Sequence, residues 1–265
     1  MLAAMDPRPV GIFDSGVGGL SVLGEFRKLA PSERVIYFAD TAYFPYGPRP
    51  AAEVRKRAFA IVHRLLESGV KMVIVACNTA SAAAIDDLRS MYDLPFVGMV
   101  PGVKPAASRS RSGRVVILAT PGTLDGELYA RVVEDFGGRA RITSVSGSGL
   151  AEIVEDGQAG TTIAREAVRQ MLGPEVVAGV DTVVLGCTHY HFLADDIRAE
   201  FPGIDIVDTS EAVARRALQL LHELGQLAPE DQGGQLDLIV TGDPARFRAA
   251  MAGLGFAPTP QEATT

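Results

Sequence analysis

The stretch VIVACNTAS, residues 73–81, and the stretch VVLGCTHY, residues 183–190, decide how this chain is interpreted. In each, an apolar run typical of a buried β-strand leads directly into a cysteine, and polar side chains with hydroxyl, amide or imidazole groups follow. Cys77 and Cys187 are the two cysteines of the chain. Both thiols are therefore expected where a strand ends, which is where ligands bind in an open α/β sheet.

Short apolar runs alternate with longer helical patterns along the chain. This alternation predicts mostly parallel sheets with helices on both faces. The predicted strands span residues 10–13, 35–39, 72–75, 96–99, 115–119, 141–145, 182–185, 204–207 and 236–240. The predicted helices span residues 19–30, 51–68, 81–91, 123–136, 149–155, 161–172, 191–201, 210–224 and 245–254.

The two halves of the chain repeat one order of features. Each half opens with a strand and a polar turn, and a cysteine follows a later strand, 62 residues after Ser15 and 67 residues after Thr120. We therefore predict two similar flavodoxin-like α/β domains with mostly parallel sheets, related by a pseudo-twofold axis, with the active site in the cleft between them. We expect residues 1–98 with 208–265 to form the first domain and residues 99–207 the second.

Composition narrows the class of protein. The chain has 265 residues, of which 47% are hydrophobic and 22% charged, which is typical of a globular protein. Its net charge of −7 argues against a nucleic-acid partner. No apolar run approaches the ~18 residues of a membrane span, and the first residues lack the pattern of a signal peptide. We expect a cytoplasmic homodimer that binds a small molecule, with no nucleic-acid or membrane partner.

Neither a metal site nor a cofactor site is predicted. The two cysteines lie far apart in the sequence, and no CxxC or HxxxH spacing suggests a zinc site. The turn at Gly16, Gly18 and Gly19 lacks the third glycine of a dinucleotide fingerprint. We interpret it either as plain turn geometry or as a place where backbone amides approach a small anion.

Several polar residues lie near the predicted strand ends. Asp14 directly follows the first strand, and His189 lies two positions beyond Cys187, where it could assist proton movement at that thiol. Glu155 is a weaker candidate, because most carboxylates at a helix end face solvent. The loop at Tyr46-Gly47 suits either a rigid turn or a contact with a substrate carboxylate.

Two thiols at equivalent positions in one cleft suit a reaction that needs similar groups on opposite faces of one atom. Racemisation without a cofactor is such a reaction, because one group removes a proton and the other returns one. The residues alone leave a second class open, namely a two-lobed protein that binds a small dicarboxylate without chemistry.

Six segments, in this order along the chain, resemble the glutamate racemases of the cofactor-independent aspartate/glutamate racemase superfamily. They are GIFDSGVGGLS at 11–21, Asp40-Thr41 with PYG at 45–47, ACNTA at 76–80, ATPGT at 119–123, Val154-Glu155 and GCTHY at 186–190. The chain departs from the family pattern at His191-Phe192, where proline and leucine are common, and at 146–149, where many relatives have cysteine and proline.

The resemblance implies an isomerase that interconverts L-glutamate and D-glutamate by two-base transfer of the α-proton and supplies D-glutamate for peptidoglycan, with no cofactor and no metal. It implies that Cys77 and Cys187 exchange the proton, with Asp14 assisting Cys77, and Glu155 and His189 assisting Cys187. Substrate contacts are implied at Asp14, Ser15, Tyr46, Gly47, Asn78, Thr79, Thr123, Thr188 and His189. Another small acidic amino acid, such as aspartate, is the alternative substrate.

Overall fold

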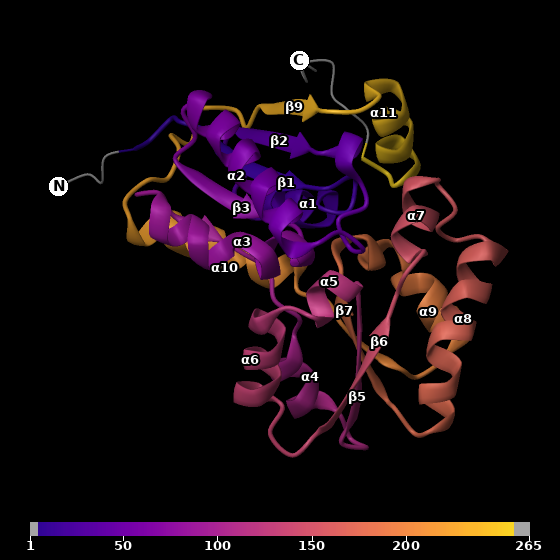
Figure 1. The fold of residues 1–265 in the computed structure, drawn as a ribbon. Coiled ribbons are helices and arrows are strands. Elements are labelled where there is room, and N and C mark those ends of the chain that lie inside the picture. Colours follow the sequence, from indigo (N-terminus) through magenta and orange to yellow (C-terminus); the bar gives the residue numbers. More distant parts are fainter. Residues whose placement is uncertain (1–4, 257–265) are drawn as a thin grey trace.

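A computed structural model of the chain describes residues 5–256 and contains two β-sheets whose strands are all parallel (Figure 1). The first sheet has the order β4-β3-β1-β2-β9 and the second the order β6-β5-β7-β8. The first sheet consists of β1 (Val10–Asp14), β2 (Val35–Ala39), β3 (Met72–Val75), β4 (Phe96–Val97) and β9 (Leu236–Val240). The second consists of β5 (Arg114–Ala119), β6 (Arg141–Ser146), β7 (Thr182–Gly186) and β8 (Asp205–Val207).

The two sheets share one strand order. When the first four strands of each are numbered within their own sheet, both run 2-1-3-4, because β2-β1-β3-β4 corresponds to β6-β5-β7-β8. Strand β9 extends the first sheet beside β2. The prediction of two similar α/β units with parallel sheets is confirmed.

Helices cover both faces of each sheet (Figure 1). Around the first sheet, α1 (Leu20–Leu29), α10 (Ser210–Glu223) and α11 (Pro244–Gly253) pack on one face, and α2 (Ala51–Glu67) and α3 (Asn78–Met91) on the other. Around the second, α4 (Val103–Arg109) and α6 (Glu127–Phe136) face α7 (Leu150–Glu155), α8 (Thr162–Val177) and α9 (Ala194–Glu200) across the sheet. Short helical turns α5 (Pro121–Leu124), η1 (Thr41–Tyr43) and η2 (Thr188–Leu193) complete the set.

The apolar pattern of the sequence explains these layers. Strands β1, β2 and β3 are buried along their whole length, as expected of a parallel sheet that is covered on both faces. Helix α2 buries one stripe of side chains three or four positions apart, from Val54 to Leu65. One continuous cluster of buried side chains runs from α1 and α10 to α7, α8 and α9, so the two units share a core.

Several predicted boundaries were wrong. The helix predicted at 123–136 is two helices, because the chain turns at Asp125-Gly126, and the absence of a side chain at Gly126 lets this corner lie against Ala82 of α3. The predicted helix 191–201 begins as the 3₁₀ helix η2 directly after Cys187. Helix α4 spans Val103–Arg109, where the sequence analysis predicted no helix.

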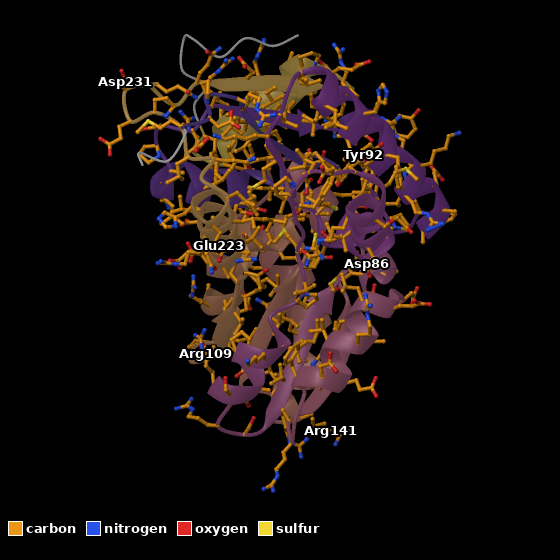
Figure 2. The ribbon with its side chains drawn as sticks, turned by 90° about the vertical axis from the view of Figure 1, so that its left-hand side faces the viewer. Asp86, Tyr92, Arg109, Arg141, Glu223 and Asp231 are labelled. Atoms are coloured by element: carbon orange, nitrogen blue, oxygen red, sulfur yellow. The ribbon has the colours of Figure 1, made fainter. Side chains whose placement is uncertain are left out.

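The two units meet near the middle of the molecule. Figure 2 shows Asp86 of α3 near this junction and Arg141 at the far end of the second sheet. Asp86 pairs with Arg131 of α6 at 2.6 Å. No helix within residues 5–256 has the length and apolar character needed to cross a membrane. The residue boundaries given above for the two domains stay a prediction, and residues 1–4 and 257–265 lie outside the described part.

Candidate active site

The cavity of interest lies where the carboxyl ends of the two sheets meet. Ser15 follows β1, Cys77 follows β3, Thr120 follows β5 and Cys187 follows β7, and all four line this cavity. In both sheets the strands concerned are neighbours at the point where the strand order reverses, which is the usual ligand position in this kind of sheet. Two such points therefore share one cavity.

Cys77 directly precedes helix α3 and is its N-cap residue. Its backbone is extended, and its Sγ accepts a hydrogen bond from the amide of Ala80 at 3.5 Å, so the thiol caps the helix. The side chain is buried, although it reaches the cavity. Burial, and secondly the charge of Asp14, raise the pKa of Cys77 well above its usual value. At neutral pH, Cys77 is therefore a thiol.

Cys187 has a different environment. It occupies the N-cap position of the 3₁₀ helix η2 without a capping hydrogen bond from its side chain, and its Sγ lies 3.8 Å from Nδ1 of His189. The other ring nitrogen of His189, Nε2, lies 2.8 Å from Oε1 of Glu155. Burial opposes the charged form of His189, but its hydrogen bonds to Cys187 and Glu155 outweigh burial and raise its pKa well above the usual value. The imidazolium of His189 therefore lies next to the sulfur of Cys187.

Asp14 is fully buried behind the cavity wall. Its Oδ1 accepts a hydrogen bond from the amide of Gly16 at 2.7 Å, and its Oδ2 accepts one from the hydroxyl of Thr188 at 3.0 Å. Burial raises the pKa of Asp14 to about 6, although the charge of His189 and these hydrogen bonds oppose the change. Asp14 thus contacts the segment that carries Cys187, across the junction of the two units.

The glycine turn after β1 has a specific steric role. A side-chain carbon at Gly16 would overlap the carboxylate of Glu155, and one at Gly18 would overlap His189 and Thr188. The amide of Val17 donates a hydrogen bond to Oε1 of Glu155 at 2.7 Å. The sequence analysis allowed for a small anion at this turn, and in the structure the group that the turn approaches is the carboxylate of Glu155.

Asn78 presents an unused amide to the cavity. Its side chain is 3% exposed, and neither its oxygen nor its nitrogen has a hydrogen-bond partner among the residues that the structure describes. Buried polar groups are normally paired, so an unpaired amide on a cavity wall is suited to bind a ligand. Nearby, the hydroxyl of Thr79 lies 2.8 Å from that of Thr120, which joins α3 to the start of α5.

The position of Tyr46 at the cavity depends on Asp40, to which the sequence analysis gave no role. Its hydroxyl donates a hydrogen bond to Asp40, which is fully buried and also binds Arg57 of α2 and Thr241 after β9. This network fixes the loop that carries Tyr46 and Gly47. Asp40 could have been singled out from the sequence because it directly follows β2.

The structure brings most of the predicted site residues together. The cavity is lined by Ser15, Tyr46, Gly47, Cys77, Asn78, Thr79, Cys187, Thr188 and His189. Three predicted residues, Asp14, Glu155 and Thr123, lie behind its wall, and Thr123 is hydrogen-bonded to Thr120 at 3.0 Å. Residues that line it but received no role from the sequence include Thr120, Tyr190, Ser148 and Glu152. Within residues 5–256, no group of three or more His, Cys, Asp or Glu side chains is placed to hold a metal ion.

Comparison with known proteins identifies the family. Residues 21–217 match the model of the Asp/Glu/Hydantoin racemase family. A glutamate racemase of Deinococcus radiodurans is 45% identical over 257 residues, which cover 94% of this chain and 89% of that protein. One of Roseiflexus is 46% identical over 91% of this chain and 89% of that protein. This chain belongs to the glutamate racemase family. Members of the family are isomerases.

Solved structures of this family share the fold. A glutamate racemase of Bacillus anthracis has a TM-score of 0.87 at 30% identity, with 97% of this chain and 96% of that chain covered. A glutamate racemase of Escherichia coli, solved with L-glutamate and an activator, has a TM-score of 0.83 at 34% identity, with 94% and 96% covered.

The glycine turn yields a steric prediction. Gly18→Ala should abolish catalysis while leaving the fold intact, because the added methyl group displaces His189 and Thr188 and leaves the sheets untouched. Gly173→Ala is the matched control, because a side chain there meets nothing within 4 Å and replaces glycine inside helix α8. Racemase assays with circular dichroism should separate the two variants, and a fully active Gly18→Ala variant would contradict this role.

The raised pKa of Asp14 yields a prediction about stability. A carboxyl whose pKa is about 6 in the folded chain and 3.8 in the unfolded chain stabilises the fold below pH 3.8, and this stabilisation is lost as pH rises through about 6. Asp14→Asn keeps the uncharged form at every pH. Relative to the natural chain, it should therefore gain about 2.4 kcal/mol of stability as the pH rises from 4 to 7.

Urea unfolding of both proteins at the two pH values measures this difference. Asp135→Asn, an exposed carboxylate on α6, serves as the control. An Asp14→Asn variant whose stability relative to the natural chain does not change with pH would show that folding does not raise the pKa of Asp14.

Proposed function

We propose that this chain interconverts L-glutamate and D-glutamate by moving the α-proton between Cys77 and Cys187. The observation that carries the proposal is that the two thiols follow equivalent strands of two similar sheets and line the same cavity. A substrate held in this cavity therefore has a sulfur from each unit beside it.

The reaction needs one thiolate and one thiol. The thiolate takes the α-proton and becomes a thiol, which leaves an electron pair on the α-carbon. This pair takes a proton from the opposite thiol, which is left as a thiolate. The configuration inverts because the proton leaves one face and arrives at the other, and the reverse reaction starts from the exchanged protonation states.

The two environments suit these two states. Cys77, whose pKa is raised, starts as the thiol. Cys187 lies beside His189, whose raised pKa favours the imidazolium, and takes the role of the proton acceptor in this proposal. Glu155 holds His189 in place, and Asp14 lies near Cys77, so we assign them supporting roles at the thiol that each faces. A buried site with oriented groups is what proton transfer from a weakly acidic carbon requires.

Neutral donors recognise the substrate in this proposal. The unpaired amide of Asn78, the hydroxyls of Ser15 and Thr79 and the first turn of the 14-residue helix α3 can bind a carboxylate. We assign further contacts to Tyr46, Gly47, Thr188 and His189, which line the cavity. Asp14 and Thr123, which were expected to contact the substrate, do not line it, and we assign them support of Thr188 and Thr120, respectively.

Glutamate as the substrate is supported by the relatives. The similar proteins named above are glutamate racemases, and the structures of the Escherichia coli and Francisella tularensis enzymes contain L-glutamate and D-glutamate, respectively. We propose that the reaction takes place in the cytoplasm and supplies D-glutamate for peptidoglycan. That the chain acts as a homodimer stays a prediction.

Single replacement of either cysteine tests the proposal. Cys77→Ala and Cys187→Ala should each lower racemisation in both directions by a factor of about a hundred to ten thousand, because one face of the α-carbon loses its proton carrier. Circular dichroism reports the change of configuration, and mass spectrometry in heavy water reports deuterium at the α-carbon of the product.

Ser148→Ala, on the cavity wall, is the control and should remain active. Racemisation by a folded Cys77→Ala variant at the natural rate would refute the two-base mechanism. Exchange with aspartate in place of glutamate would identify the alternative substrate, and saturable binding without exchange would identify a binding protein.

A further inference from the structure

The cavity has an exposed rim and a buried floor. Cys77 and Cys187 are buried, whereas Ser148 and Gly149 on the rim are exposed and Glu152 is half-buried. These three rim residues belong to one short segment, the β6–α7 loop and the first turn of α7. The rim on this side is therefore formed by the second unit alone.

Glu152 is the only carboxylate among the described residues that line the cavity, and none of them is lysine or arginine. Within residues 5–256, no hydrogen bond or ion pair engages the Glu152 side chain, whereas the nearby Glu155 is held by Val17 and His189. The charge of Glu152 acts on Tyr190, another residue of the cavity wall, where burial and then the charges of Cys187 and Glu152 raise the tyrosine pKa.

An unpaired carboxylate at this position weakens the binding of a dicarboxylate ligand. Like charges repel across a half-buried rim, and the described cavity wall has no lysine or arginine to compensate. The cation on this wall, the imidazolium of His189, is already paired with Glu155. An ammonium group on the ligand changes this balance, because it is attracted by the same carboxylate. The net effect therefore differs between glutamate, which carries an ammonium group, and dicarboxylates of the same length that lack one.

We propose that Glu152 is a specificity-determining residue, which admits dicarboxylates that carry an ammonium group and disfavours those that do not. This inference rests on the proposed function, because it assumes that glutamate occupies the cavity. Glutarate and 2-oxoglutarate represent the disfavoured class. Both have two carboxylates and resemble the substrate in size.

Replacing the charge with an amide of the same shape tests the proposal. Glu152→Gln should tighten glutarate binding relative to D-glutamate binding, by roughly fivefold for the loss of one repulsion near a solvated rim. The dissociation constants of glutarate and D-glutamate are measured by calorimetry on the full chain. The selectivity difference between the two proteins should shrink in about 0.5 M NaCl, which screens charges at the rim.

Glu134→Gln is the matched control, because it removes the same charge from an exposed position on α6, outside the cavity lining. Glu152→Ser gives a second neutral side chain should the glutamine variant fold poorly. An unchanged ratio of the two dissociation constants in both Glu152 variants, or an equal change in Glu134→Gln, would overturn the proposal. Racemisation by the natural chain is assayed in parallel, so failure of the proposed function shows itself separately as an inactive natural chain.

Discussion

Two hydrogen bonds that cross between the sheets hold both thiols at one cavity. The hydroxyl of Thr188 donates to Asp14 at 3.0 Å, and the amide of Val17 donates to Glu155 at 2.7 Å. Both are made beside the glycine turn, where a side chain on Gly16 would overlap Glu155 and one on Gly18 would overlap His189 and Thr188. Because Cys187 and His189 flank Thr188 in sequence, the position of this thiol depends on the contact that Asp14 makes. The close approach of the turn to η2 is thus a condition for any chemistry that uses both sulfurs.

The two halves share a strand order but differ in their electrostatics. Cys77 caps a regular helix and lies near a buried carboxyl, whereas Cys187 occupies the N-cap position of a 3₁₀ helix and lies beside a histidine that is held by Glu155. A symmetric environment would give the two thiols the same protonation state at rest. The two thiols therefore differ in their surroundings, which suits the two unlike roles that the proposed two-base reaction requires.

The sequence allowed the fold to be predicted because the strands have continuous apolar runs, and it placed Cys77 and Cys187 at strand ends. It also located Asn78 and Thr188 next to them. Features that depend on contacts between distant segments could not be predicted in this way. The turn at Gly126 depends on contact with Ala82, and the role of Asp40 depends on Arg57 and Thr241. Glu152 resembled any other charged residue of an amphipathic helix, and only the three-dimensional structure shows that its unpaired carboxylate lies on the cavity wall.

The central claim is that one α-carbon lies between two sulfurs. A crystal structure of the chain with D-glutamate bound measures this most directly. The account predicts the Sγ atoms of Cys77 and Cys187 in van der Waals contact with the α-carbon from opposite faces. A bound glutamate whose α-carbon contacts one sulfur, with the second on the same face or out of reach, would contradict it.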